Sequence, residues 1–291
     1  MGLELRVLGP GDEAEVQQFL LQHPFTTMFL RSNLRAAGLV DRGQIYGATW
    51  MAATVAGDIV GVAALCWNGV ILVQSGDYTA ELVRAVARSH SRKVLGLIGP
   101  WSMVTEGLNT LGLNPSQLQI ESREDLFVLD LAELRVPVLL QSGEASCLPA
   151  QAEHFGLLSE WSADFGIETM GESDTPEYRR RCREGVVRSG TEGHLWELLV
   201  NEQPVSTSNF NACLPDCVQI GGVWTPEAER GKGYARSVVA GSLLAARSQG
   251  VRSSVLFTPE TNEAARRAYE SLGYRKAGDY GILLFREGHS C

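Results

Sequence analysis

Several features that define common protein classes are absent from this chain of 291 residues. It has no apolar run long enough to cross a membrane and no segment that resembles a secretory signal, so we expect a cytoplasmic protein without a membrane partner. Basic residues are outnumbered by acidic ones, and the formal net charge is −9. This surplus argues against nucleic acid as a partner, because phosphate backbones are bound by clusters of lysine and arginine.

Metal-binding patterns are also absent. The six cysteines are scattered, and the closest pair, Cys213 and Cys217, has no second pair of cysteine or histidine residues nearby. We therefore expect no metal site and a chain that keeps its thiols reduced. No cysteine lies in a motif that requires an acyl-enzyme.

The most informative stretch that is present runs from Val223 to Ala235, with the sequence VWTPEAERGKGYA. It joins the end of an apolar strand to the start of a long helix through a basic loop. The first turn of a helix has free N–H groups and the positive end of the helix dipole, so it suits a phosphate. Gly231 and Gly233 let the backbone approach an oxyanion without an intervening Cβ atom. The stretch therefore predicts a diphosphate site.

Two common phosphate motifs do not describe this stretch. It has no Walker pattern, and it lacks the third glycine and the acidic residue of a dinucleotide-binding fingerprint. Residues Arg230-x-x-Gly233-x-Ala235 resemble instead the [RQ]-x-x-G-x-[GA] motif of the GNAT superfamily of N-acetyltransferases, which use acetyl-coenzyme A. A second GNAT signature, N-x-x-A-x-x-x-Y-x-x-x-G-[FY], is matched from Asn262 to Tyr274.

The elements predicted around both motifs follow the order of the GNAT fold. Apolar alternation and turn residues predict strands at 194–200, 205–213 and 217–224, a helix from 233 to 250, a strand at 251–258, a helix from 262 to 273, and last strands at 274 and 282–285. The resemblance covers residues 135–291, which we expect to form the catalytic acetyltransferase domain.

The first half repeats this order in a degenerate form. It is predicted to contain strands at 3–8, 48–55, 59–67, 71–75, 94–99 and 125–131, and helices at 12–22, 29–37, 79–90 and 101–111. Its counterpart of the basic loop, Gln74 to Thr79, carries Asp77, which would repel a diphosphate. We expect residues 1–134 to form a GNAT-like domain without a coenzyme A cradle; an unrelated α/β domain with the same element order is the alternative.

The expected fold class is therefore α/β (α+β), with two GNAT-like domains in tandem. Each is expected to be a mixed, mostly antiparallel central sheet flanked by helices, as the resemblance implies.

The resemblance also implies which residues bind acetyl-coenzyme A. The main chain of Val223 and Thr225, on either side of Trp224, would pair with the pantetheine arm. The backbone N–H groups and basic side chains of one loop would bind the diphosphate, and a helix cap, Asn262, would contact the coenzyme arm. The loop residues are Arg230, Gly231, Lys232, Gly233, Tyr234, Ala235 and Arg236.

Tyr269 is the candidate acid. In the family a tyrosine at this position points its hydroxyl at the coenzyme A sulfur. A phenol with a reference pKa of about 10 stays protonated at neutral pH and can donate to a departing thiolate.

The general base stays open. Many GNAT members carry a glutamate on the strand before the cradle, and the strand 217–224 has none. His194, Glu197 or a chain of water molecules are the alternatives, and Asn209 or Asn211 could orient the amine.

We expect an acetyl-CoA-dependent N-acetyltransferase that moves an acetyl group to a primary amine of a small molecule. The amine would attack directly in a ternary complex, and the protein would be a monomer or a homodimer. The alternatives are a coenzyme A-binding sensor without turnover and a protein-lysine acetyltransferase.

Overall fold

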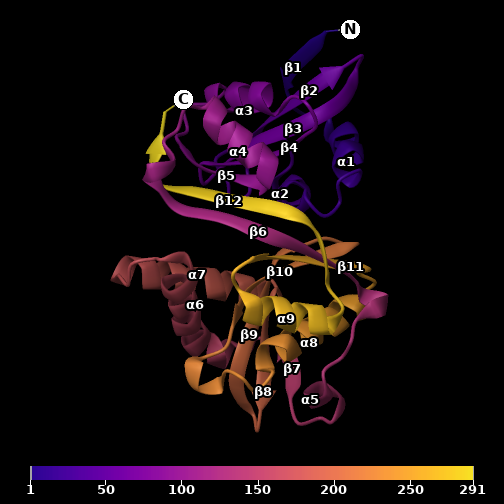
Figure 1. Cartoon of the computed structure of the whole chain (residues 1–291), viewed down its shortest axis with the longest axis vertical. Coiled ribbons are helices and arrows are strands. Elements are labelled where there is room, and N and C mark those ends of the chain that lie inside the picture. The colour runs from indigo at the N-terminus through magenta and orange to yellow at the C-terminus, as the bar shows by residue number, and fades with distance from the viewer. Residues whose placement is uncertain (1, 291) are drawn as a thin grey trace. The chain divides into compact units, whose positions relative to one another are not determined.

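The chain forms two compact units in a computed structural model that describes residues 2–290 (Figure 1). Unit 1 is built from the described residues up to Asp125 and from Gly278 onward, and unit 2 is Leu126–Ala277. This division differs from the expected boundary between residues 134 and 135, because the last strand of the chain is part of unit 1.

Unit 1 contains a mostly antiparallel sheet in the order β1-β2-β3-β4-β5-β12. Only β4 and β5 pair in parallel among these neighbours. Its strands are β1 (Leu3–Val7), β2 (Ala48–Val55), β3 (Asp58–Cys66), β4 (Val70–Ser75), β5 (Val94–Pro100) and the greater part of β12 (Arg275–His289); its helices are α1 (Glu13–Leu21), α2 (Met28–Ala37), α3 (Thr79–Arg88) and α4 (Trp101–Thr110).

Alternation along the strands gives the sheet of unit 1 two buried faces. Met51 and Ala53 of β2 pack in a core with α3 and α4. Trp50 and Ala52, their neighbours in the strand, pack in a second core with α1 and α2. Helices therefore cover both faces of this sheet.

The C-terminal strand completes unit 1. Residues 282–284 pair antiparallel with Ile98, Leu97 and Gly96 of β5, and Leu283 is fully buried among the α3 and α4 side chains. Gly96 permits this approach, because an added Cβ atom would lie 2.4 Å from the carbonyl oxygen of Leu283. We had expected the strand at 282–285 to close the second half, and this pairing corrects that expectation.

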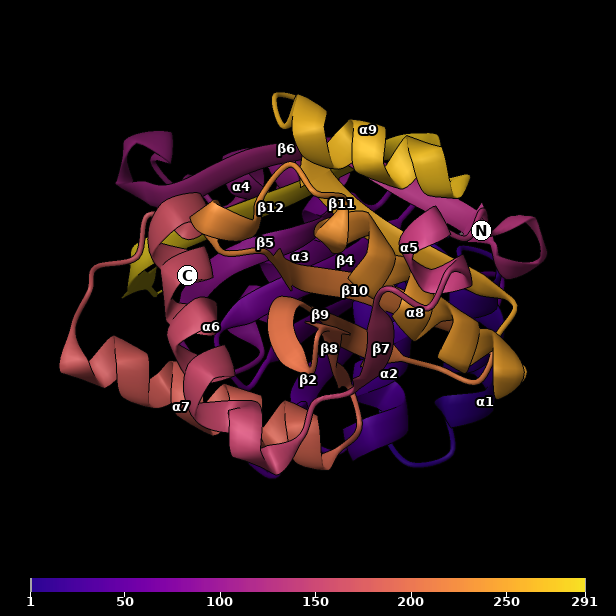
Figure 2. The same ribbon diagram turned by 90° about the horizontal axis from the view of Figure 1, so that it is seen from below.

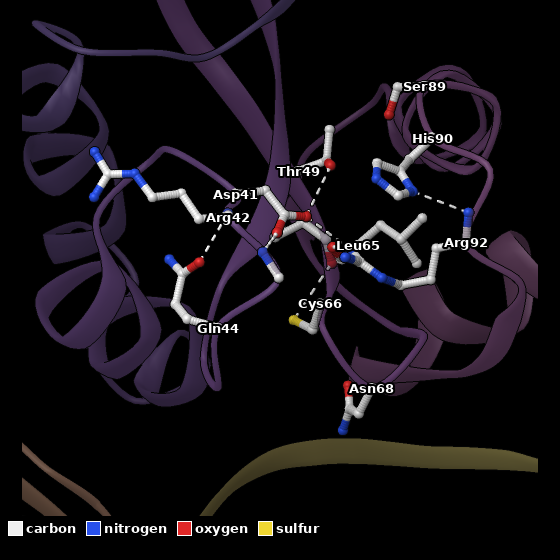
Figure 3. Close-up of polar contacts among 12 residues, drawn as sticks. Asp41, Arg42, Gln44, Thr49, Leu65, Cys66, Asn68, Ser89, His90 and Arg92 are labelled. Atoms are coloured by element: carbon white, nitrogen blue, oxygen red, sulfur yellow. Dashed lines mark hydrogen bonds and ion pairs between the residues drawn. The ribbon is translucent and has the colours of Figure 1, made fainter.

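A partly buried ion pair ties the connection between α2 and β2 to the sheet (Figure 3). The Asp41 carboxylate accepts hydrogen bonds from Arg92 Nη1 and the Gly43 N–H, each at 2.9 Å. Arg92 also donates to the carbonyl oxygen of Leu65 at 3.2 Å. Although desolvation opposes it, the hydrogen bond from Arg92 contributes to holding the pKa of Asp41 below its ordinary value.

Unit 2 has the strand order β6-β11-β10-β9-β8-β7, in which β10 and β11 pair in parallel. The strands are the end of β6 (Leu118–Asp130), β7 (Ser146–Pro149), β8 (Leu195–Val200), β9 (Gln203–Cys213), β10 (Cys217–Trp224) and β11 (Ser253–Pro259); the helices are α5 (Val138–Gln141), α6 (Phe155–Met170), α7 (Pro176–Thr191), α8 (Tyr234–Ser248) and α9 (Glu263–Leu272). Helices α6 and α7, which precede β8, were not predicted.

The helices of unit 2 cover opposite faces of its sheet (Figures 1 and 2). Trp196 of β8 packs in the core that α8 fills, with α9 against it. Its neighbour Leu195 packs with Leu158 of α6 and Val186 of α7. Since successive side chains of a strand point to opposite faces, α6 and α7 lie on one face and α8 and α9 on the other.

Membrane-spanning helices and metal-binding clusters are absent from the described residues. Across residues 2–290, no helix is long and apolar enough to cross a membrane. Within the same range, no group of three or more His, Cys, Asp and Glu side chains is arranged to hold a metal ion.

Candidate functional site

Strands β10 and β11 begin as a parallel pair and then separate. Within the described residues their register runs from Cys217 opposite Ser253 to Ile220 opposite Leu256 and ends there, although β10 continues to Trp224 and β11 to Pro259. We call the divergence between residues 221–224 and 257–259 the wedge, with its apex at the last pair. The edge of β10 along the wedge can accept another extended chain.

The loop before α8 lies beyond the end of β10 and presents unused N–H groups. Gly231 and Gly233 have φ angles of 79° and 81°, a left-handed conformation that favours glycine. The first backbone hydrogen bond of α8 runs from the Ser237 N–H to the Gly233 carbonyl oxygen at 3.2 Å. In the described part of the chain, the N–H groups of residues 231–236 have no hydrogen-bond acceptor. These N–H groups lie where the sequence predicts an anion site, and the binding of an anion there stays a prediction.

Arg230 connects this loop to β10 and α6 through hydrogen bonds and a contact with an aromatic ring. Its Nε donates to the carbonyl oxygen of Thr225 at 3.0 Å, and its Nη2 donates to Glu168 Oε2 of α6 at 2.9 Å. The guanidinium also lies 4.8 Å from the centre of the Trp224 ring. The hydrogen bond to Glu168 raises the pKa of Arg230. Its charge is thereby shared with a carboxylate of the protein.

Arg236 differs from the other basic residues of the loop. Lys232 Nζ donates to Glu229 Oε2 at 2.9 Å, and this bond raises the pKa of Lys232. Arg236 is exposed and lies beside Gly233, where an added Cβ atom would come within 3.1 Å of its Nε. No carboxylate among residues 2–290 pairs with Arg236. It is therefore the cation of this loop that the protein leaves without a counter-charge.

The last residues of β10 are held rigidly. Ser206 Oγ donates to the carbonyl oxygen of Trp224 at 2.9 Å and lies 2.8 Å from Thr225 Oγ1. The Trp224 ring packs edge-on against Phe165 of α6, and Val223 packs against the α8 core. The strand edge beside the wedge is thus fixed before any ligand binds.

Helix α9 carries the second motif. Asn262 caps the helix as predicted, because its Oδ1 accepts a hydrogen bond from the Ala265 N–H at 3.1 Å. Tyr269 is half-buried, and its ring lies 6.0 Å from that of Tyr274 in an edge-to-face arrangement. The Tyr274 hydroxyl is buried and lies 2.7 Å from Ser254 Oγ.

Neither side chain that we considered as a base stands free. Glu197 is 0% exposed, and its carboxylate binds His154 Nδ1 at 2.8 Å and the Gln151 N–H at 3.1 Å. His194 lies at the start of β8 with its Nδ1 3.4 Å from Glu192 Oε2. The Glu197 carboxyl group is accordingly engaged in the protein's own hydrogen bonds.

A row of amide side chains lies on the α7 face of the sheet beside the wedge. The hydroxyl of Ser189 on α7 is bonded to Asn209 Oδ1, and Asn209 Nδ2 donates to Asn211 Oδ1 at 3.2 Å. Asn211 in turn lies directly over Gly221, where an added Cβ atom would fall 2.0 Å from its Nδ2. Gln219 lies two residues earlier in β10 and was not among the residues predicted from the sequence. The signal that could have identified it is an amide side chain in the middle of an apolar strand.

Two of the buried or partly buried thiols, Cys66 and Cys147, do not suit nucleophilic chemistry. Burial raises the pKa of Cys147 to about 12 and that of Cys66 to about 12. A thiol with such a pKa is protonated at neutral pH, so neither residue supplies a thiolate.

Comparison with known proteins links this geometry to a family. The profile of the Acetyltransferase (GNAT) family matches residues 157–274. The uncharacterized N-acetyltransferase YycN of Bacillus subtilis (strain 168) is 34% identical over 87 residues, which are 28% of this chain and 56% of that protein. The chain thus spans about half the length of this curated relative.

Solved structures extend the likeness to both units. A GCN5-related N-acetyltransferase from Sphaerobacter thermophilus has a TM-score of 0.58 at 13% identity, covering 99% of this chain and 98% of that one. One from Kribbella flavida has a TM-score of 0.55 at 17% identity, covering 97% and 98%. A tandem GNAT protein from the clavulanic acid biosynthesis pathway has a TM-score of 0.53 at 13% identity, covering 97% of each chain.

At these identities the solved structures show a shared fold alone. They confirm the expected mixed, mostly antiparallel sheet with flanking helices, in a chain whose size fits two GNAT-like domains. Residues 157–274 of unit 2 thus match the Acetyltransferase (GNAT) family, and the chain shares its fold with solved GNAT structures.

Proposed function

We propose that the protein is an acetyl-CoA-dependent N-acetyltransferase that acetylates a primary amine of a small molecule by direct attack in a ternary complex. One observation carries the proposal: a strand edge left open by the wedge continues into a helix start whose N–H groups at 231–236 have no acceptor within the described chain. A pantetheine arm and a diphosphate are the two parts of coenzyme A that these features suit.

The residues that would hold acetyl-CoA divide into a strand edge and an anion site. The main chain of Val223 and Thr225 would pair with the pantetheine arm, beside Trp224, and Asn262 would meet the arm from α9. The N–H groups of residues 231–235 would bind the diphosphate. Arg236 would contact the phosphates directly, since it has no carboxylate partner among the described residues, while Arg230 and Lys232 keep the loop in shape.

Acetyl-CoA, when bound, supplies the thioester whose carbonyl carbon the amine attacks. As the C–N bond forms and the C–S bond breaks, the Tyr269 hydroxyl donates its proton to the departing sulfur. The amine loses its proton to water, because Glu197, the carboxylate considered as a base, is hydrogen-bonded to His154. The raised pKa values of the Cys66 and Cys147 thiols agree with direct transfer rather than a covalent acyl-enzyme.

Two measurements on the full-length protein test this function. Titration calorimetry with acetyl-CoA should give micromolar or tighter binding. A panel of aliphatic amines, amino alcohols, amino sugars and lysine peptides should then show release of free thiol with at least one small amine. Binding without turnover of any amine would favour a coenzyme A sensor, and turnover of the peptides alone would favour a protein-lysine acetyltransferase.

A further inference from the structure

One buried polar group beside the apex of the wedge takes no part in the protein's own hydrogen bonding. Gln219 is 1% exposed and pairs in the sheet with Ala212 of β9 and Val255 of β11, one residue before the last β10–β11 pair. Its Oε1 has no hydrogen-bond partner among the described residues. Buried amides almost always have a partner, so an exception calls for one that the protein chain itself does not provide.

The position of Gln219 in β10 joins it to the row of amides. Side chains two residues apart in a strand point to the same face, so Gln219 lies on the face of Gly221. Asn211 covers Gly221 on that face, and Asn209 links it to Ser189 of α7. The members of this row are amides and a hydroxyl. They can orient a polar ligand, but at neutral pH they cannot take a proton from it.

We propose that Gln219 positions the acceptor amine for attack. Its Oε1 accepts a hydrogen bond from one N–H of the amine, which leaves the nitrogen lone pair directed toward the thioester carbonyl. This inference rests on the proposed acetyltransferase function and adds the residue that makes the amine productive. Attack requires the nitrogen lone pair, which a protonated amine lacks, and Gln219 cannot take the extra proton. The free-base amine, formed by loss of that proton to water, is therefore the reactive form.

The protons and bonds balance without a base from the protein. The neutral amine forms the new C–N bond and the C–S bond breaks. The proton that the nitrogen loses passes to water, and the sulfur receives one from Tyr269, which recovers it from solvent. In the wild type, kcat/KM should therefore rise with pH along the pKa of the acceptor itself, about 10 for a lysine-like amine.

The test compares Gln219→Met, Gln219→Glu and a matched control. Methionine has nearly the shape of glutamine and removes an unsatisfied buried group, so Gln219→Met should melt no lower than the wild type. It should bind acetyl-CoA with unchanged Kd, raise the acceptor KM and lower kcat/KM by about 10- to 100-fold, the range expected for loss of a buried hydrogen bond. Gln219→Glu places a carboxylate there, which should add a rise in kcat/KM below the pKa of the amine.

Gln74→Met is the control, because Gln74 is also a buried glutamine near the end of a strand but its Oε1 accepts a hydrogen bond from Thr26 Oγ1 at 2.7 Å. This variant should lose stability and keep the wild-type acceptor KM. If the wild type turns over an amine and Gln219→Met has the same kinetics, Gln219 does not position the amine, while the proposed acetyltransferase function stands. If the wild type binds acetyl-CoA but acetylates no amine, the proposed function fails and this role falls with it.

Discussion

Two neighbouring tyrosines on and after α9 separate a chemical role from a packing role. Tyr269 is half-buried at the motif position, whereas Tyr274 is fully buried with its hydroxyl 2.7 Å from Ser254 Oγ. If Tyr269 protonates the departing thiolate, Tyr269→Phe should lower kcat by about 10²- to 10⁴-fold and leave the acetyl-CoA Kd nearly unchanged. Stopped-flow or steady-state thiol release together with calorimetry measures both quantities.

Tyr274→Phe supplies the matched control for this prediction. It removes a hydroxyl from a buried hydrogen bond, so it should cost about 1 kcal/mol of stability and change kcat by no more than a few-fold. Equal effects of the two substitutions on kcat would mean that Tyr269 only packs its ring.

A second residue-scale prediction concerns the buried pair of Glu197 and His154. Glu197 is fully buried, and the side chain that hydrogen-bonds to its carboxyl group is His154, with Nδ1 at 2.8 Å. His154→Ala removes a hydrogen-bond partner from the buried Glu197 carboxyl group, and leaving a buried polar group unsatisfied typically costs about 1–3 kcal/mol. Chemical denaturation should show this loss, and the double variant with Glu197→Gln should be more stable than His154→Ala alone. Additive losses in the double variant would show that the two side chains are not coupled.

At the scale of single elements, the start of α8 depends on Gly233. Its φ of 81° and the Arg236 side chain beside it make this position sensitive to both shape and charge. Gly233→Asp should weaken acetyl-CoA binding by more than about 100-fold, because like charges about 4 Å apart repel by about 4 kcal/mol at an effective dielectric constant near 20. Calorimetry on the folded variant measures the change.

Gly233→Asn separates the charge from the backbone strain. Asparagine has the size of aspartate and tolerates the left-handed region, so this variant should lose about tenfold in affinity or less. If both variants bind acetyl-CoA as the wild type does, the diphosphate does not lie at this loop.

The elements that the sequence predicted best are those whose ends carry local signals. β10 was predicted at 217–224 and is observed there, because turn residues bound it on both sides. A few adjacent residues likewise indicate the helix cap at Asn262 and the start of α8 after Gly233. Helix α7 was missed because only Val186 of its residues is buried, which leaves almost no apolar period to detect.

Features set by distant contacts could not be predicted in the same way. The site of the general base stayed open because the sequence does not reveal that Glu197 meets His154, 43 positions away. The partner of the last strand was misassigned for the same reason. Local alternation shows that residues 282–285 form a strand. The pairing with β5 depends on a distant residue, Gly96, whose lack of a Cβ atom allows the backbone of Leu283 to approach.

That pairing gives an element-scale prediction for β12. Leu283 is fully buried in the core of unit 1 with α3 and α4, although it lies near the end of the chain. Leu283→Ala should destabilise unit 1 by about 2–5 kcal/mol, the usual cost of such a cavity. Calorimetric melting with and without saturating acetyl-CoA reports it, and Val138→Ala at a surface position 72% exposed is the control. Unaltered melting of Leu283→Ala would contradict the observed strand pairing.

The two units differ in what lies at the open end of their parallel strand pair. β4 and β5 of unit 1 also stop pairing before β4 ends, at Leu72 and Ile98. Here the N–H of Ser75 donates to the sulfur of Met103 at 3.3 Å, and an added Cβ atom on Gly99 would lie 2.7 Å from the carbonyl oxygen of Val73. The corresponding position in unit 1 is therefore filled by the protein's own backbone and side chains.

The two units also differ in the charge of the loop that precedes the helix after the first strand of the parallel pair. The loop before α3 carries Asp77 and no basic residue, whereas the loop before α8 carries Arg230, Lys232 and, just inside the helix, Arg236. A diphosphate at α3 would meet a carboxylate, whereas one at α8 would meet Arg236, which has no carboxylate partner among the described residues. We therefore predict that one acetyl-CoA binds per chain, in unit 2.

Titration calorimetry on the full-length protein measures this stoichiometry directly. The expected value is one, and Gly233→Asp should abolish the whole signal because it alters the single site. Asp77→Arg in the same background tests whether charge alone excludes the coenzyme from unit 1. We expect no binding to appear, because Met103 and the close approach of Gly99 to Val73 still fill the space. A stoichiometry of two in the wild type, or a remaining site in Gly233→Asp, would show that unit 1 binds the coenzyme as well.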